Sequence, residues 1–348
     1  MDQTHNLKEN VMSDKPRVIL SGFADEAANN KTAIEQFAVY SALGLQYYSI
    51  RFINLGEGVK NVMKLTREDI QTIRQLQDEY GLNVSAIGSP IGKIKLEDID
   101  DGTANVFVPF ETYLENDVNI ACELAHAFET KLIRGFSFYH PKGNDPQNYV
   151  AAVADRIGQI TETCHRNDLT FGLEVEANLV GQNGHILAEI FKQVNHPALT
   201  LIFDGANVVM QGYTPEEIFA QYEAMKPGLS WFHIKDYMAV QTDAKGGHVN
   251  EDAMAGFVPC DMGSSGYEAI LLDFATICPQ VEARLKQRGI PGVFVDLEPH
   301  LKGGGQFGGF SGPDGSGVAL RALCRVLDNT GFDYHLRDFD DIKASRGF

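Results

Sequence analysis

The chain has 348 residues, of which 44% are hydrophobic and 22% charged, a balance typical of globular proteins. Its 29 Lys and Arg residues against 47 Asp and Glu residues give a net charge of −18. Such a charge repels phosphate backbones and anionic lipid head groups, so neither a nucleic-acid nor a membrane partner is expected. The length allows one large domain or two ordinary ones.

The N-terminal segment is polar and lacks the apolar stretch of a secretory signal. We therefore expect residues 1–15 to be a disordered extension and residues 16–348 to form the folded part. No run approaches the ~18 apolar residues of a membrane span. The five cysteines form no CxxC pair, which favours free thiols in a reducing compartment over a disulfide framework or a zinc ribbon. These features predict a cytoplasmic protein.

Eight short apolar runs predict β-strands, because each is too short for a helix and many contain β-branched or aromatic residues. In chain order they are 17–23, 46–52, 83–88, 131–138, 170–176, 200–203, 230–234 and 292–297.

Longer amphipathic segments alternate with these strands. Thr66 begins one with a Thr-Arg-Glu-Asp capping pattern, and Thr214 followed by Pro215 begins another. The alternation predicts a parallel α/β sheet, and eight repeats without a linker predict a single (β/α)8 TIM barrel. The predicted helices are 27–43, 66–80, 116–129, 146–167, 185–194, 214–225, 267–288 and 316–330.

Two connections are long, residues 236–266 after the seventh strand and residues 300–315 after the eighth. In a barrel both lie on the face that carries active sites. The second is rich in glycine, which suits either a lid or a close approach of backbone to a ligand; a merely flexible loop is the alternative. No GxGxxG motif follows the first strand, so a dinucleotide site is not indicated.

The last four predicted strands end in acidic residues or a histidine. Strand five ends in Glu174 and Glu176, strand six in Asp204, strand seven in His233, and Glu298 follows strand eight. The carboxyl ends of barrel strands meet on one face, and side chains two positions apart share a side of the strand. We therefore expect these groups to converge at the barrel mouth.

Carboxylates this close would raise one another's pKa values unless a cation neutralised them. Three oxygen ligands and one imidazole suit one divalent metal ion, with Mn2+ favoured and Mg2+, Zn2+, Co2+ or Fe2+ as alternatives. A single acid at a strand end is more often a helix cap, so the prediction rests on the four successive strands. The predicted ligands are Glu174, Asp204, His233 and Glu298, with Glu176 the alternative to Glu174.

The Glu–Asp–His–Glu order resembles the xylose isomerase-like TIM barrel superfamily. Several strings are similar to its sugar phosphate isomerase/epimerase-like (AP endonuclease family 2) proteins: GFADE at 22–26, SIR at 49–51, GSPIGK at 88–93, RGFSF at 134–138, EVE at 174–176, HIKD at 233–236 and EPHL at 298–301. The resemblance spans about residues 16–337. It implies a metal-dependent sugar or keto-sugar isomerase or epimerase with a small carbohydrate substrate, and a homodimer is possible.

The mechanism that this resemblance implies is proton abstraction next to a carbonyl through a metal-stabilised enediolate. Glu174 and Glu298 would be the acid/base pair. If a β-hydroxyl leaves instead, the protein is a lyase or dehydratase acting on a keto-sugar, a keto-inositol or an oxidised glycoside. A non-catalytic sugar-binding barrel is the alternative outside the enzymes.

Further polar residues near the strand ends could bind sugar hydroxyls or a phosphate, or could merely balance nearby acids. Asp25 and Glu26, after the first strand, are weaker candidates. The predicted substrate-binding residues are Arg51, Lys93, Arg134, Glu176, Asn207, Lys235, Asp236 and His300.

The chain departs from the ketose 3-epimerases of this superfamily at two places. Asn207 stands where those enzymes have a histidine, and no arginine follows His233 closely. These differences argue against 3-epimerisation of a free ketose. The early strands also lack the histidines of the endonuclease IV metal cluster, which argues against that activity.

Overall fold

The computed structural model describes residues 15–239, 245–246, 248–250, 255–303 and 308–345. The predicted N-terminal extension, residue 15 excepted, lies outside this part of the chain. Among the described residues, no helix is both long and apolar enough to cross a membrane. All five cysteines are free thiols, and four of them are buried.

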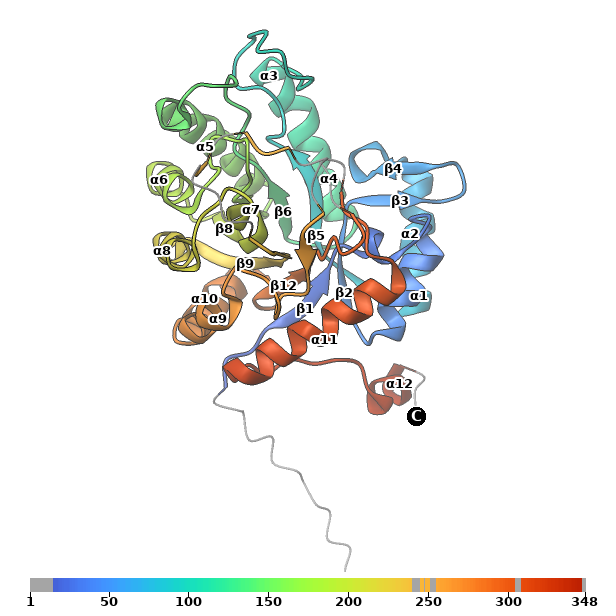
Figure 1. Cartoon of the computed structure of the whole chain (residues 1–348). Coiled ribbons are helices and arrows are strands. Elements are labelled where there is room, and N and C mark those ends of the chain that lie inside the picture. The colour runs from blue at the N-terminus through green and yellow to red at the C-terminus, as the bar shows by residue number, and fades with distance from the viewer. Residues whose placement is uncertain (1–14, 240–244, 247, 251–254, 304–307, 346–348) are drawn as a thin grey trace, which may run out of the picture.

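Eight parallel strands form the barrel in the order β1-β12-β9-β8-β7-β6-β5-β2, which confirms the predicted TIM barrel. An isolated parallel bridge between Phe23 and Ser49 links the two end strands. Figure 1 shows the strands at the centre with the helices arranged around them. The strands are β1 Ile19–Gly22, β2 Tyr47–Ile50, β5 Asn83–Ile91, β6 Leu132–Gly135, β7 Thr170–Glu174, β8 Leu199–Asp204, β9 Leu229–Ile234 and β12 Phe294–Leu297.

The outer helices start and end largely where the capping patterns indicate. Thr66 and Thr214 each complete a capping box, and Gly81 ends its helix in the left-handed conformation. The longer helices are α1 Ala33–Ala42, α2 Arg67–Tyr80, α4 Asn119–Ala127, α5 Val150–Arg166, α6 Gly184–Val194, α8 Pro215–Met225, α9 Tyr267–Ala275, α10 Cys278–Gln287 and α11 Gly312–Thr330.

Three predicted helices differ from those observed. The helix predicted over 27–43 begins only at Ala33, where the Thr32 side chain provides the N-cap. The helix predicted over 267–288 is broken into α9 and α10, because Pro279 has no N–H to continue the α9 hydrogen-bond ladder. The last helix, α11, begins at Gly312 rather than at Ser316. The first turn contains two glycines, which disfavour a helix, so the sequence did not predict it. In the structure, burial of one face of α11 stabilises this turn.

Several short elements lie between the longer ones, and most of them were not predicted from the sequence. Two small antiparallel hairpins are present, one of β3 Phe52–Asn54 with β4 Val59–Asn61 and one of β10 Asp236–Tyr237 with β11 Phe257–Val258. The remaining short elements are η1 Ala24–Ala27, η2 Val62–Lys64, α3 Phe110–Tyr113, η3 Leu114–Val118, η4 Pro146–Tyr149, α7 Gly205–Val209 and α12 Phe339–Ser345.

A polar layer lies inside the barrel below the mouth. Ser85 Oγ contacts Ser21 Oγ at 2.7 Å and Ser49 Oγ at 3.1 Å, and Ser49 also donates a hydrogen bond to Asp296. All four side chains are buried. Because buried polar groups need partners, this network holds these four side chains in place directly below the residues of the barrel mouth.

Candidate metal centre

Strand register brings the predicted ligands together. Asp204 and His233 are direct partners in the β8–β9 ladder, and His233 is also the partner of Asp296 on β12. Glu298 lies two residues beyond Asp296, so it shares that side of the strand, one step nearer the mouth. Glu174 is the last residue of the neighbouring strand β7.

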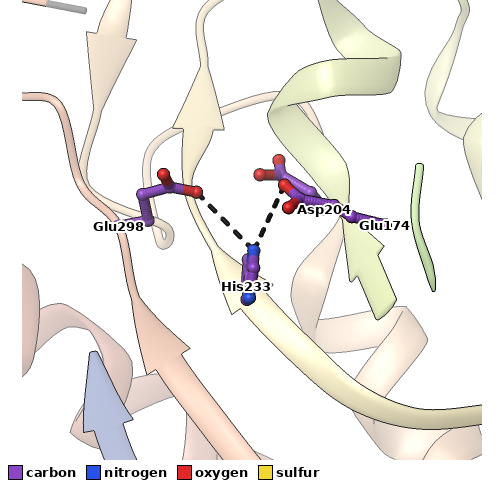
Figure 2. A group of neighbouring side chains, drawn as sticks. All are labelled: Glu174, Asp204, His233 and Glu298. Carbon is purple, nitrogen blue, oxygen red and sulfur yellow. Dashed lines mark ion pairs between the residues drawn. The ribbon is translucent and has the colours of Figure 1, made fainter. Parts of the chain in front are cut away.

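The four side chains form one buried cluster. Glu174, Asp204, His233 and Glu298 each offer a ligand atom, and these atoms lie within 4.8 Å of one another. His233 Nδ1 is 3.2 Å from Glu174 Oε1 and 3.7 Å from Glu298 Oε2. Figure 2 shows Glu298 on one side of the imidazole and Glu174 on the other. The exposed fraction of each residue is 3% or less. Glu176 is not part of this cluster.

The donor set fits a divalent cation. Metal–oxygen bonds of about 2.0–2.6 Å place two ligand atoms of one ion at most ~5 Å apart, a limit that the cluster meets. Glu298 Oε2 is buried and has no hydrogen-bond partner among the described residues, so its lone pairs could bind a cation. Asp204 has two roles, because its Oδ1 accepts a hydrogen bond from Asn207 N at the start of α7 while its carboxylate also faces the cluster.

The carboxylates of the cluster differ in charge state. Burial raises the pKa of Asp204 to about 8, since the lowering effect of Lys235 does not offset it. Burial also acts on Glu174, but His233 and Arg134 outweigh it and lower the pKa to about 2. Without a metal ion, Asp204 therefore holds a proton at neutral pH, and a bound divalent cation would favour its release.

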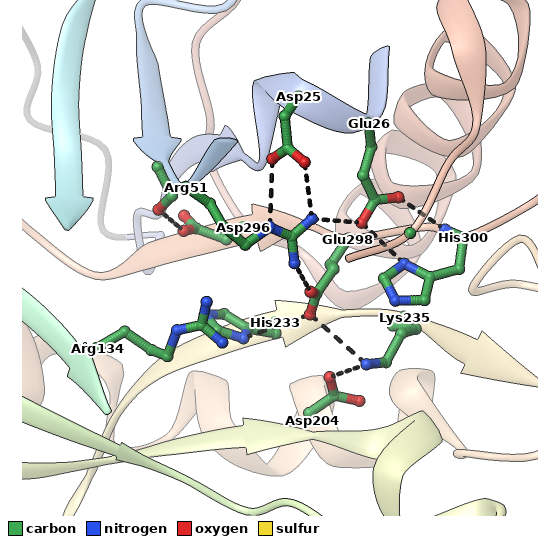
Figure 3. A network of polar contacts seen from close by, with 12 residues as sticks. Asp25, Glu26, Arg51, Arg134, Asp204, His233, Lys235, Asp296, Glu298 and His300 are labelled. Carbon is green, nitrogen blue, oxygen red and sulfur yellow. Dashed lines mark hydrogen bonds and ion pairs between the residues drawn. The ribbon is translucent and has the colours of Figure 1, made fainter. Parts of the chain in front are cut away.

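Cationic side chains surround the cluster (Figure 3). Arg134 Nη1 is 3.0 Å from Glu174 Oε2, and Lys235 Nζ is 3.0 Å from Asp204 Oδ2. Arg51 donates to Glu298 Oε1 at 2.6 Å. The same guanidinium contacts Asp25 and Glu26, two buried acids that the sequence marked only weakly.

His300 is held in a constrained position at the edge of the cluster. Its ring Nδ1 is 2.8 Å from Glu26 Oε1, and its backbone N–H donates to Glu26 Oε2 at 2.9 Å. Its φ is +52°, which is strained for a residue with a side chain. Gly309 packs on the imidazole so closely that a Cβ there would lie 2.0 Å from Nδ1. The glycine-rich loop thus lets backbone approach His300; its residues 304–307 lie outside the described part.

A cavity adjoins the cluster at Glu298, and most predicted substrate-binding residues lie on its wall. Asp236 is the exception, because it does not line this cavity and its carboxylate is bound within the 263–265 turn. The predicted substrate-binding residues on the wall are Arg51, Lys93, Arg134, Glu176, Asn207, Lys235 and His300, and the predicted metal ligand Glu298 is there as well. Ser89, from the GSPIGK string, also lines it, as do Phe52, Asn61 and Phe257, which were not predicted as site residues.

Comparison with known proteins identifies the architecture. The family model described as "Xylose isomerase-like TIM barrel" matches residues 37–302, most of the chain. No curated protein is significantly similar to the sequence.

Solved structures share the fold at low sequence identity. A xylose isomerase-like TIM barrel protein from Mycobacterium smegmatis, in complex with magnesium, is 17% identical with a TM-score of 0.57, over 91% of this chain and 97% of that one. D-allulose 3-epimerase from Methylomonas sp. is 14% identical with a TM-score of 0.57, over 90% and 99%. A probable 3-DHS dehydratase from Bacillus anthracis is 18% identical with a TM-score of 0.55, over 88% and 98%.

Proposed function

This chain belongs to the xylose isomerase-like TIM barrel family, and we propose that it is a divalent-metal-dependent isomerase or epimerase of a sugar or keto-sugar. The observation that carries the proposal is the buried Glu174–Asp204–His233–Glu298 cluster, whose member Glu298 lines a cavity with several charged side chains on its wall. Solved structures with the same fold include a sugar epimerase, a dehydratase and a magnesium complex.

The same four side chains would hold the metal ion, for which Mn2+ is our preferred candidate. The ion would supply Lewis-acid stabilisation of the negative charge that develops when a proton leaves the carbon beside a carbonyl. Three carboxylates and one imidazole also suit Mg2+, Zn2+, Co2+ or Fe2+. The magnesium complex of the Mycobacterium smegmatis protein supports a divalent ion in this fold.

Glu174 and Glu298 are the proposed acid/base pair. Neighbouring cations hold the pKa of each well below its usual range despite burial, so both carboxylates are ionised at neutral pH, the charge state in which a general base begins its reaction. They lie on opposite sides of His233 (Figure 2), an arrangement that suits removal of a proton at one position and its return at another.

The surrounding residues would position the substrate. Lys235 is buried beside Asp204 and Glu298 and lines the cavity, so its ammonium group can donate hydrogen bonds to a substrate oxygen. Arg134 holds Glu174, and Arg51 holds Glu298. These contacts fix the two proposed proton-transfer groups in place.

A lyase or dehydratase acting on a keto-sugar is the second candidate. Lys235 lies 3.6 Å from Glu298 Oε2, so a proton donor stands beside a proton acceptor, as loss of water from neighbouring carbons requires. A mass loss of 18 Da in the product would distinguish this reaction from isomerisation, which changes no mass.

The test is solvent exchange. The metal-loaded protein is incubated in D2O with a panel of keto-sugars, and deuterium at the carbon beside the carbonyl is followed by NMR. We expect incorporation with at least one sugar, and a loss of about 10²–10⁴-fold in Glu298→Gln. Metal content is measured for both proteins, and Glu57→Gln, at an exposed acid, is the matched control. Binding of a sugar without exchange or turnover would instead support a non-catalytic barrel.

A further inference from the structure

A second cavity opens at the barrel mouth, and none of its described lining residues lines the cavity at Glu298. Its volume is about 550 Å³, within the range of ~300–1,000 Å³ that is usual for ligand sites. The lining residues lie within 101–105, 139–146, 178–182 and 248–250. These segments follow the carboxyl ends of the barrel strands β5, β6, β7 and β9. The second cavity is therefore on the face where TIM barrels bind their ligands.

Hydrogen bonds between the loops hold this second cavity open. Asp101 Oδ1 accepts from Thr103 N at 3.2 Å and from Thr103 Oγ1 at 2.7 Å, and Asp101 Oδ2 accepts from Lys142 N at 3.1 Å. The first loop is thereby tied to the second. Asn178 ties the third loop to the fourth, because its Nδ2 donates to Val249 O at 2.9 Å and its Oδ1 accepts from Val249 N at 2.8 Å. Walls that are already ordered lose little conformational freedom when a ligand binds.

The two cavities differ in the charge of their walls. The cavity at Glu298 is lined by cations and carboxylates, whereas uncharged amide and imidazole groups predominate in the second cavity. Burial lowers the pKa of His140, so this imidazole is neutral at pH 7. Two charged side chains line the second cavity, Asp101, which is 2.8 Å from Lys95 Nζ, and Lys142, which is exposed. Besides His140, the amide and imidazole groups include Asn105, Asn144, Gln182, His248 and Asn250.

Such a lining suits a ligand rich in hydroxyl groups. A side-chain amide offers both donors and an acceptor, and a neutral imidazole offers one of each. A hydroxyl also donates and accepts, so each hydroxyl of a sugar ring can be paired with groups of this kind. A few placed polar groups in a preformed cavity are what fixes the orientation of a small ligand. The second cavity thus has the size and the chemistry for an uncharged sugar ring.

The second cavity adjoins the first along two loops. Glu176 lines the first and Asn178, two residues later, lines the second, so their Cα atoms are at most ~7 Å apart. Phe136 and Tyr139 are divided between the cavities in the same way and belong to one buried cluster. The cavity at Glu298 has a volume of only about 70 Å³, room for roughly five to seven water molecules. A ligand larger than one sugar unit therefore has to extend out of it.

We propose that the second cavity binds a second, uncharged sugar ring of the substrate, so that the protein acts on a disaccharide that carries the keto-sugar unit at the metal cluster. The inference rests on the proposed function, since it takes the reacting unit to lie beside Glu298. It deepens that function by assigning the second ring a site of its own, in which side chains such as Gln182 and His140 bind its hydroxyls.

The experiment compares ketoses with their disaccharides on the metal-loaded protein. Each ketohexose of a panel is titrated by calorimetry beside disaccharides that carry a glucosyl group on one of its hydroxyls, and exchange in D2O is followed for both. A ligand that occupies two adjoining sites gains affinity from both. We therefore expect the best disaccharide to bind about tenfold or more tightly than its parent ketose.

Two variants test the second cavity itself. Ala104 is exposed on its wall, so Ala104→Trp should fill the cavity and abolish the advantage of the disaccharide, while exchange with the ketose stays at the wild-type level. Gln182→Ala removes one hydrogen-bonding group and should weaken disaccharide binding by roughly 3–10-fold. Ala152→Trp, at an exposed position of α5, is the matched control and should bind both sugars as wild type does.

The outcomes separate this inference from the proposed function. Exchange with a ketose, but no disaccharide that binds more tightly, overturns the inference and leaves the proposed function standing. A disaccharide advantage that survives in Ala104→Trp places the second ring elsewhere and also overturns it. So does loss of ketose exchange in an Ala104→Trp protein whose thermal melt shows that it is folded. Exchange with neither kind of sugar contradicts the proposed function itself.

Discussion

The two sides of the barrel mouth bury acids equally well but neutralise them differently. Beside β1, Glu26 is fully buried, yet His300 and Arg51 outweigh the effect of burial and lower its pKa. At the end of β8, Asp204 is just as buried, but its pKa is raised to about 8, since Lys235 does not offset burial. On the β1 side the neighbouring cations are enough to keep the buried acid ionised. On the β8 side Lys235 alone does not compensate for the burial of Asp204.

This contrast explains the role of Arg51, which compensates the charge of several buried acids at once. Arg51 presents a fork of N–H donors that reaches Asp25, Glu26 and Glu298 at once, which a point charge cannot do. Glu298 thereby joins the two sides, because it shares Arg51 with the acids of η1 and shares the cluster with Asp204. A metal ion at the cluster would complete the neutralisation that the side chains leave unfinished.

Arg51→Met should have the largest effect on the difference between the two sides, because it removes the cation that the acids of the β1 side share. The variant leaves buried carboxylates without their cation, so we expect the free energy of unfolding to fall by about 3–5 kcal/mol. Urea denaturation measures this change. Arg74→Met, at an exposed ion pair with Glu129, is the matched control and should cost less than about 1 kcal/mol. Equal effects in the two variants would show that Arg51 is not needed for charge compensation.

A smaller effect is expected at Asp236, a buried acid that forms no ion pair within the described part of the chain. Burial raises its pKa to about 6 from a usual value near 3.9. Relative to Asp236→Asn, its stabilisation is fully present below about pH 4 and is lost as pH rises through 6, by up to about 3 kcal/mol. Urea titrations at pH 4, 5, 6 and 7 measure the difference. A constant difference between the two proteins across this range would contradict the raised pKa.

The smallest expected change in stability comes from metal binding. It tests directly whether the β8 side lacks positive charge. Saturating Mn2+ at a hundred times its dissociation constant should stabilise the protein by about 2.7 kcal/mol, and a chelator should reverse the gain. Thermal melts of wild type and His233→Ala report it. Glu57→Gln should respond like wild type, and a His233→Ala protein that still gains stability from Mn2+ would argue against the cluster as the metal site.

Much of the site was predictable because it follows strand periodicity. Glu174, Asp204, His233 and Glu298 all stand at or just beyond strand ends, and the order of parallel strands in a barrel brings such positions together. Glu174 lies in the cluster and Glu176 on the cavity wall, and the choice of Glu174 as the metal ligand stays a prediction. The break at Pro279 was also readable from the sequence, since proline interrupts a helix ladder, but the amphipathic pattern on both sides concealed it.

The sequence by itself determined the barrel and the side of each strand that faces its interior, because both depend on local alternation and repetition. Only the tertiary structure decided how charge is shared, since Arg51 reaches Glu298 and Glu26 reaches His300 across most of the chain. It also decided that Asp236, three residues from His233, turns away from the cavity into the 263–265 turn. Such pairings depend on distances between segments that no local pattern encodes.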